Sequence, residues 1–255
     1  MSSDTQKEHW DFYSCEIEGK PYSTMVNLSL VDVAPVLKLN VFHCIEVKLH
    51  YPDPNHGMTT AGEYQTLSDL EDLIFASQTD QIKYVARQTG GRKRKFYFYG
   101  SSETAADSVV SALDESFPAY TKTAFNFEDA AWQTYLEDLY PNAIAMNEIK
   151  NRAVYFRLED DGDDLSIPRE IDHSVIFHSR KQAKEFERIV TQKGFKVTTT
   201  TQGILKKSFD LLVQRVDAPQ SLDPVTFELE QLAEGLGGSY DGWGCFTQKQ
   251  AGAAT

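Results

Sequence analysis

The chain has 255 residues, of which 41% are apolar and 25% charged, a composition typical of a globular protein of one or two domains. Because 38 acidic residues outnumber 25 basic ones, the net charge of −13 argues against a diffuse nucleic-acid-binding surface or adhesion to an anionic membrane. The N-terminal sequence lacks the apolar core of a signal peptide, and three widely spaced cysteines form no disulfide framework. We therefore expect a soluble, cytoplasmic protein.

The charge is unevenly distributed along the chain. Residues 1–148 hold 11 basic and 22 acidic residues (net −11), whereas residues 149–255 hold 14 and 16 (net −2). This asymmetry indicates two units, and the sequence around Pro141 predicts a linker over residues 141–148.

The first half is predicted to combine strands with single helices. Helical spacing of Leu67, Leu70 and Ile74 predicts the first helix, and residues 101–113 and 129–140 predict two more. Alternating apolar or aromatic residues predict strands over residues 10–17, 22–31, 41–51, 82–87, 96–99 and 120–127, with 41–51 half-buried. The basic run 92–95 lies between two of these strands, and we interpret it as a solvent-exposed hairpin tip rather than a nucleic-acid site.

The second half repeats this arrangement. The same patterns predict strands over residues 145–150, 152–158, 169–177, 195–201 and 208–216, and helices over residues 179–193 and 223–236, the latter capped by Asp223. We predict the α+β class: two ferredoxin-like sandwich domains with mostly antiparallel sheets, over residues 8–140 and 146–247. Residues 248–255 are expected to form a disordered tail.

Motifs for catalysis, cofactors or metals are not found. The acidic turn from Asp160 to Asp164 lacks the ligand spacing of a calcium loop, so we interpret it as a solvated turn. His173 and His178 are five residues apart and face opposite sides of a strand, which argues against a shared metal ion. We expect His173 to be a buried or interfacial hydrogen-bonded residue. No phosphate-binding loop, nucleophile elbow or activated cysteine is present.

Residues 146–247 carry a more specific pattern. In order, they contain Gly162-Asp-Asp-Leu165, Pro168-Arg-Glu-Ile-Asp-His173, Gly194-Phe-Lys-Val197 and Gly237-Gly-Ser-Tyr-Asp-Gly-Trp-Gly-Cys245. These motifs resemble the regulator of ribonuclease E activity B (RraB) family. Residues 8–140, with Trp10 and the strand over residues 96–99, are similar to a domain of unknown function that often precedes it.

The resemblance implies a ferredoxin-like α+β sandwich in an acidic, cytoplasmic, bacterial protein without catalytic activity or cofactor. It also implies a protein partner, ribonuclease E, bound without direct contact to nucleic acid. Two alternatives remain open. One is a metal-assisted hydrolase or nuclease that uses the acids of residues 160–164 with His173. The other is an adaptor that has kept only the fold.

The candidate contacts for a partner all lie in the second domain. They are Asp160, Asp161, Asp163, Asp164, Arg169, His173, Asp241 and Trp243. We expect the four acids of the turn to meet a basic partner. Arg169 is expected to pair with Asp172 or with the acidic turn. Trp243 is expected to cover the core with its indole N–H bound to a carbonyl group, or else to act as a surface anchor.

Overall fold

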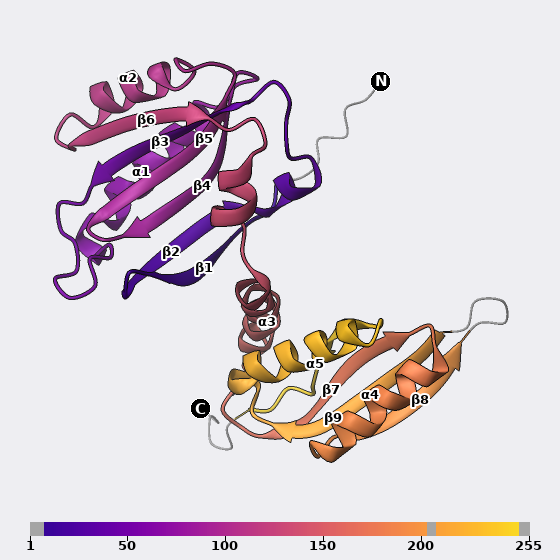
Figure 1. Cartoon of the computed structure of the whole chain (residues 1–255). Coiled ribbons are helices and arrows are strands. Elements are labelled where there is room, and N and C mark those ends of the chain that lie inside the picture. Colours follow the sequence, from indigo (N-terminus) through magenta and orange to yellow (C-terminus); the bar gives the residue numbers. More distant parts are fainter. Residues whose placement is uncertain (1–7, 203–207, 250–255) are drawn as a thin grey trace. The chain divides into compact units, whose positions relative to one another are not determined.

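A computed structural model describes residues 8–202 and 208–249 (Figure 1). The chain divides into two compact units, residues 1–145 and residues 146–255. Among the described residues, no helix has both the length and the apolar character needed to cross a membrane.

The first unit is built on a six-stranded sheet in the order β1-β2-β4-β5-β3-β6, in which all neighbours are antiparallel. Its elements are β1 (Trp10–Ile17), β2 (Lys20–Asn27), β3 (Val41–Lys48), α1 (Ala61–Ala76), β4 (Ile82–Gly90), β5 (Lys93–Gly100), α2 (Asp107–Ser116) and β6 (Lys122–Glu128). From β3 to β6 the order βαββαβ is that of a ferredoxin-like fold, and the β1–β2 hairpin extends the sheet beside β4. The predicted fold class is confirmed for this unit.

Both faces of this sheet are covered. On one face Leu67, Leu70 and Ile74 of α1 pack with α2 against β3, β4 and β5, as their spacing predicts. On the other face Trp132 stacks on Tyr99 with ring centroids 4.0 Å apart. Every residue from 41 to 45 is therefore buried, and the prediction that this strand is half-buried is wrong.

One local prediction in this unit is also wrong, and another is right only in part. Residues 129–140 form only a π-helical turn, η2 (Thr134–Leu139), because the left-handed backbone of Trp132 (φ 56°) interrupts a helix from residue 129. The Asp129 carboxylate accepts the backbone N–H groups of Gln133 and Thr134, at 2.8 and 2.9 Å, where the turn begins. The basic run lies at the β4–β5 hairpin as predicted, but only Arg92 and Lys93 are exposed. Only Arg92 lies in the turn, while Arg94 belongs to β5, is 6% exposed and donates to the hydroxyl of Thr89.

The second unit contains a four-stranded antiparallel sheet in the order β10-β7-β9-β8. Its elements are α3 (Ala143–Asp160), β7 (Arg169–Phe177), α4 (Arg180–Gln192), β8 (Lys196–Gln202), β9 (Ser208–Asp217), α5 (Asp223–Gly235) and β10 (Ser239–Gly244). Short 3-10 turns complete the described elements of the chain: η1 (Leu28–Asp32) and η3 (Pro219–Ser221). From β7 to β10 the order βαββαβ is again ferredoxin-like, which confirms the predicted class.

One helix of the second unit replaces two predicted strands. Residues 143–160 form α3, so the strands predicted over residues 145–150 and 152–158, and most of the predicted linker, are wrong. Asn147 and Asn151 lie one turn apart and are each 3% exposed. Because amides occupy buried positions, the apolar periodicity that identifies an amphipathic helix is lost from the sequence.

The core of the second unit lies between the sheet and two helices. Val175 and Phe177 of β7 pack against Phe186 and Val190 of α4 and Leu229 of α5. Both helices lie on the same face of the sheet, as Figure 1 shows. Within the described part of this unit, no helix lies on the opposite face.

Candidate functional site

The acidic turn and the start of β7 are joined by a buried ion pair. Arg169 binds the Asp163 carboxylate with both terminal nitrogens, at 2.5 Å (Nη1–Oδ2) and 2.8 Å (Nη2–Oδ1). The two side chains are 3% and 0% exposed. The hydrogen bond from Arg169 lowers the pKa of Asp163, and the same bond raises that of the guanidinium. Asp160 and Asp161 are exposed beside this pair.

Arg169 also ties the end of the chain to this turn. Its remaining N–H groups donate to the carbonyl oxygens of Asp164 (2.7 Å), Ile167 (3.2 Å) and Phe246 (3.1 Å), so all five donors are used. Asp163 accepts the backbone N–H of Gln248 at 2.7 Å. Ordered chain thus continues to Gln248, beyond the predicted boundary at residue 247, while residues 250–255 lie outside the described residues.

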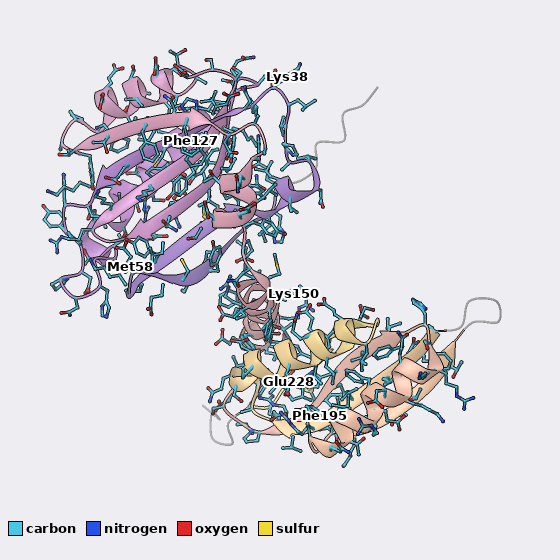
Figure 2. The ribbon with its side chains drawn as sticks, in the orientation of Figure 1. Lys38, Met58, Phe127, Lys150, Phe195 and Glu228 are labelled. Carbon is cyan, nitrogen blue, oxygen red and sulfur yellow. The ribbon has the colours of Figure 1, made fainter. Side chains whose placement is uncertain are left out.

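His173 lies in the core of the second unit. It is 0% exposed, its Nδ1 is 2.8 Å from the hydroxyl of Tyr240, and its ring meets the edge of Phe195, labelled in Figure 2. Burial lowers the pKa of His173 to about 4, outweighing the opposite effect of Asp217. Within the described part of the chain, Nε2 has no hydrogen-bond partner. His173 is thus a neutral core histidine, as the sequence predicts.

The second unit is expected to lose stability as the pH falls from about 6.5 towards about 4. The unfolded chain takes up a proton at His173 in this range, whereas the folded chain, with a pKa of about 4, does not. The pKa of His173 lies below the ordinary histidine value of 6.5. At about 1.4 kcal/mol for each pKa unit, this difference corresponds to a loss of up to about 3 kcal/mol in the free energy of unfolding. Urea unfolding at pH 7.5 and pH 5, followed by hydrogen exchange of peptides from this unit, measures the loss.

His173→Leu is expected to reduce the difference between the two pH values, because no buried imidazole remains to be protonated. The exposed His178 provides the matched control, and His178→Leu should leave the difference intact. An unchanged pH dependence in His173→Leu would show that burial of this imidazole is not its cause.

Trp243 is held by a network of buried amides. Its indole N–H donates to Oδ1 of Asn151 at 2.8 Å, and Nδ2 of Asn151 donates to Asp223 Oδ1 and Thr226 Oγ1, both at 2.7 Å. The hydroxyl of Tyr155 also donates to Asp223 Oδ1, at 3.0 Å. Trp243 therefore joins β10 to α3 and α5, which agrees with a role in covering the core. The carbonyl group predicted to accept the indole N–H belongs to the side-chain amide of Asn151.

Two features of this network were missed by sequence reasoning. Asp223 makes no capping bond, because its carboxylate turns towards α3, so the predicted N-cap is wrong. Asn147 donates to the Asp223 carbonyl oxygen at 2.9 Å and accepts from Thr226 at 2.9 Å. The available signal was the spacing of Asn147 and Asn151, which places both amides on one side of a helix.

A cavity of about 350 Å³ lies between α3, α5 and β10. Asn151, Tyr240 and Trp243 line it, and Lys150 (labelled in Figure 2) forms an ion pair with Glu230 at 2.8 Å across two of its walls. Burial raises the pKa of the Tyr240 phenol further above its ordinary value. The cavity therefore presents hydrogen-bonding and apolar groups, and its residues form no nucleophile–base pair.

The structure does not bring together the residues of the predicted alternative hydrolase site. Asp163 is engaged by Arg169, whereas His173 packs against Tyr240 and Phe195. Across residues 8–202 and 208–249, His, Cys, Asp and Glu side chains form no group of three or more that could hold a metal ion. This geometry gives the metal-assisted alternative no site in the described chain.

The candidate contacts therefore fall into two groups. Asp163, Arg169 and His173 are buried in interactions within the unit, where Arg169 pairs with the acidic turn as one of its two expected partners. Asp164 accepts the N–H and the hydroxyl of Ser166 within the turn. The exposed candidates are Asp160, Asp161 and Asp241, and Trp243 is half-buried.

Comparisons with known proteins agree with the two units. Residues 8–140 match a family of unknown function, DUF695, and residues 148–245 match the family described as regulator of ribonuclease activity B. No curated protein matches the chain.

Two solved structures show weak similarity. One is described as a candidate glycine cleavage system transcriptional repressor, with 10% identity over 82% of this chain and 98% of the other and a TM-score of 0.27. The second is an unknown protein from Galdieria sulphuraria, with 11% identity over 79% and 96% and a TM-score of 0.24. These likenesses support no conclusion about the chain.

Proposed function

Because the chain belongs to the DUF695 family of unknown function and carries a regulator of ribonuclease activity B domain at residues 148–245, we propose that it regulates RNA turnover by binding a protein partner. The partner that we propose is ribonuclease E, and the compartment is the cytoplasm. In this proposal the chain cleaves no RNA itself and acts through protein contact alone.

The family match over residues 148–245 is the observation that carries this proposal. The placement of the matched motif residues supports it. Arg169 and Asp163 form a buried ion pair, and Trp243 binds Asn151, so these residues stabilise a folded unit. A domain of this kind offers surfaces to another protein, and complementary charge on such surfaces increases the rate and specificity of encounter.

Capture from a bacterial lysate tests the proposal. The full-length chain, immobilised through one terminus, is expected to retain ribonuclease E, identified by mass spectrometry, both before and after digestion of the lysate RNA. If the two proteins contact each other directly, ribonuclease E should still be retained after RNA digestion, because no RNA bridge is needed. Recovery that disappears on digestion, or no recovery at all, would contradict the proposal.

A matched pair of variants assigns the capture to the second unit. Arg169→Ala leaves Asp163 buried without its partner and, by destabilising this unit, is expected to weaken capture. Arg188→Ala removes a cation from the exposed pair with Glu185 on α4 and is expected to retain capture.

A further inference from the structure

One face of the second sheet is left uncovered by the helices of its unit. Along β7 the odd-numbered residues from Arg169 to Phe177 are buried, and the even-numbered residues are exposed or half-buried. In a strand these two sets point to opposite faces, and α4 and α5 lie together on the buried side (Figure 1). We call the other side the open face. The β7–β9 register brings Ser174 opposite Leu212 and Ile176 opposite Asp210 on it.

The open face is acidic. Glu170 and Asp172 project from β7 and Asp210 from β9, and Asp241 of β10 borders the same surface. The basic residue in register with them is Lys196 of β8, which pairs with Gln214. Among the residues that the structure describes, four carboxylates against one ammonium group give this face a negative potential.

The helical side of the unit is mixed in charge. Helix α4 carries the basic residues Arg180, Lys181, Lys184 and Arg188 against Glu185 and Glu187. Helix α5 beside it carries the acidic residues Asp223, Glu228, Glu230 and Glu234 and no basic residue, so the helical side as a whole is not basic. A partner that meets only the open face experiences a negative field, although residues 149–255 together are nearly neutral (14 basic and 16 acidic).

A hollow lies in the middle of the open face. Its volume is about 220 Å³, and its lining includes the apolar side chains of Ile176 and Leu212 with the carboxylates of Asp210 and Asp241. Ile176 and Leu212 are half-buried without a covering helix. Apolar groups framed by like charges match a binding segment that alternates cationic and apolar side chains.

We infer that the open face binds an extended, arginine- or lysine-rich segment of a protein partner, with an apolar side chain of that segment in the hollow. RNA fits this face poorly, because carboxylates repel phosphates and the outward positions of β7, β8 and β9 hold no aromatic residue for base stacking. The inference rests on the proposed function and deepens it by assigning the surface and the chemistry of the partner.

Fluorescence anisotropy of a labelled peptide that alternates arginine and leucine, titrated with the full-length chain, tests the inference. Binding is expected to saturate and to weaken with increasing salt. Asp210→Lys with Asp241→Lys should weaken binding about tenfold, because two attractions become repulsions. The milder double variant Asp210→Asn with Asp241→Asn should weaken peptide binding about threefold. It replaces the lysine variant in the test if that variant does not fold.

The matched control is Glu228→Lys with Glu234→Lys. This pair changes the net charge by the same amount at exposed positions of α5, on the helical side of the sheet, and should bind the peptide as the unchanged chain does. An equal loss in both lysine variants would overturn the inference, because net charge alone would then explain binding. The inference would also be overturned if a labelled polyuridine bound more tightly than the peptide. The same holds if the chain self-associates and Asp210→Lys with Asp241→Lys abolishes that self-association.

The same variants separate the inference from the proposed function. If ribonuclease E is captured equally well by the Asp210→Lys, Asp241→Lys chain, the open face is not the binding surface and the inference fails while the function stands. If the peptide binds the open face but ribonuclease E is never captured, the surface stands and the partner is wrong.

Discussion

Arg169→Ala is expected to lower the free energy of unfolding of the second unit by about 3–5 kcal/mol. The substitution leaves the Asp163 carboxylate, 0% exposed, without its cation and withdraws donors from three backbone carbonyl groups. Breaking one side of a buried ion pair is costly because the remaining charge stays desolvated. Hydrogen exchange of peptides from residues 146–249 in increasing urea reports this change separately from the first unit.

The Arg169–Asp163 ion pair as a whole is not expected to contribute as much stability as Arg169→Ala removes. Asp163→Asn combined with Arg169→Gln should be considerably less destabilising than Arg169→Ala, since no buried charge remains. Arg188→Ala, in an exposed pair with Glu185, should leave the urea midpoint unchanged. A loss below about 1 kcal/mol for Arg169→Ala would mean that water reaches Asp163, and the ion pair would then not be a desolvated one.

Trp132→Ala is expected to cost the first unit about 3–5 kcal/mol in the free energy of unfolding. The indole is 0% exposed, lies 4.0 Å from the ring of Tyr99 and donates to the Leu39 carbonyl at 2.6 Å. Its removal opens a cavity on the second face of the six-stranded sheet and leaves that carbonyl without its donor. The same hydrogen-exchange measurement, made on peptides from residues 8–145, detects the loss.

The control for this change is an aromatic residue on the surface. Tyr64 of α1 is 66% exposed, so Tyr64→Ala is expected to change the free energy of unfolding by less than about 0.5 kcal/mol. A small effect of Trp132→Ala would indicate that the segment around η2 contributes little to the stability of the sheet.

The sequence predicted the strands whose pattern reports one buried face. Residues 169–177 were predicted as a strand with the bounds that β7 has, because Ile171, Val175 and Phe177 alternate with outward residues. Strand β10 was not predicted. Gly242 and Gly244 lower its strand propensity, and a bulge between Tyr240 and Gly242 interrupts its alternation.

Helix α3 shows why other elements were misassigned. Its buried positions hold Asn147 and Asn151, which find partners on Thr226 and Asp223 about 75 residues later in the chain. Such long-range hydrogen bonds leave no periodic signal, because the residue types are polar while their environment is buried. The same reasoning explains Arg94, which looked like part of an exposed basic run and is buried in β5.

The candidate site was predicted only in part. The sequence identified Asp163, Arg169 and Trp243 as candidate contacts and expected Arg169 to pair with Asp172 or with the acidic turn. The pairing with the turn is the one that forms, through Asp163, and Trp243 binds Asn151. Spacing alone does not distinguish a partner contact from a pairing within the unit, since a buried and an exposed aspartate in one acidic turn look alike. The open face was missed because Asp210 and Asp241 are 31 residues apart in the chain (241 − 210) and border one hollow only after folding.

Purified ribonuclease E provides the most direct test of regulation by protein contact. Its initial rate of cleavage of a labelled RNA is measured as the full-length chain is titrated in, together with the chain alone. The predicted result is a rate that falls to a plateau as the chain saturates ribonuclease E, with no cleavage by the chain itself. An unchanged rate at saturating chain, or RNA cleavage by the chain in the absence of ribonuclease E, would contradict a non-catalytic regulator.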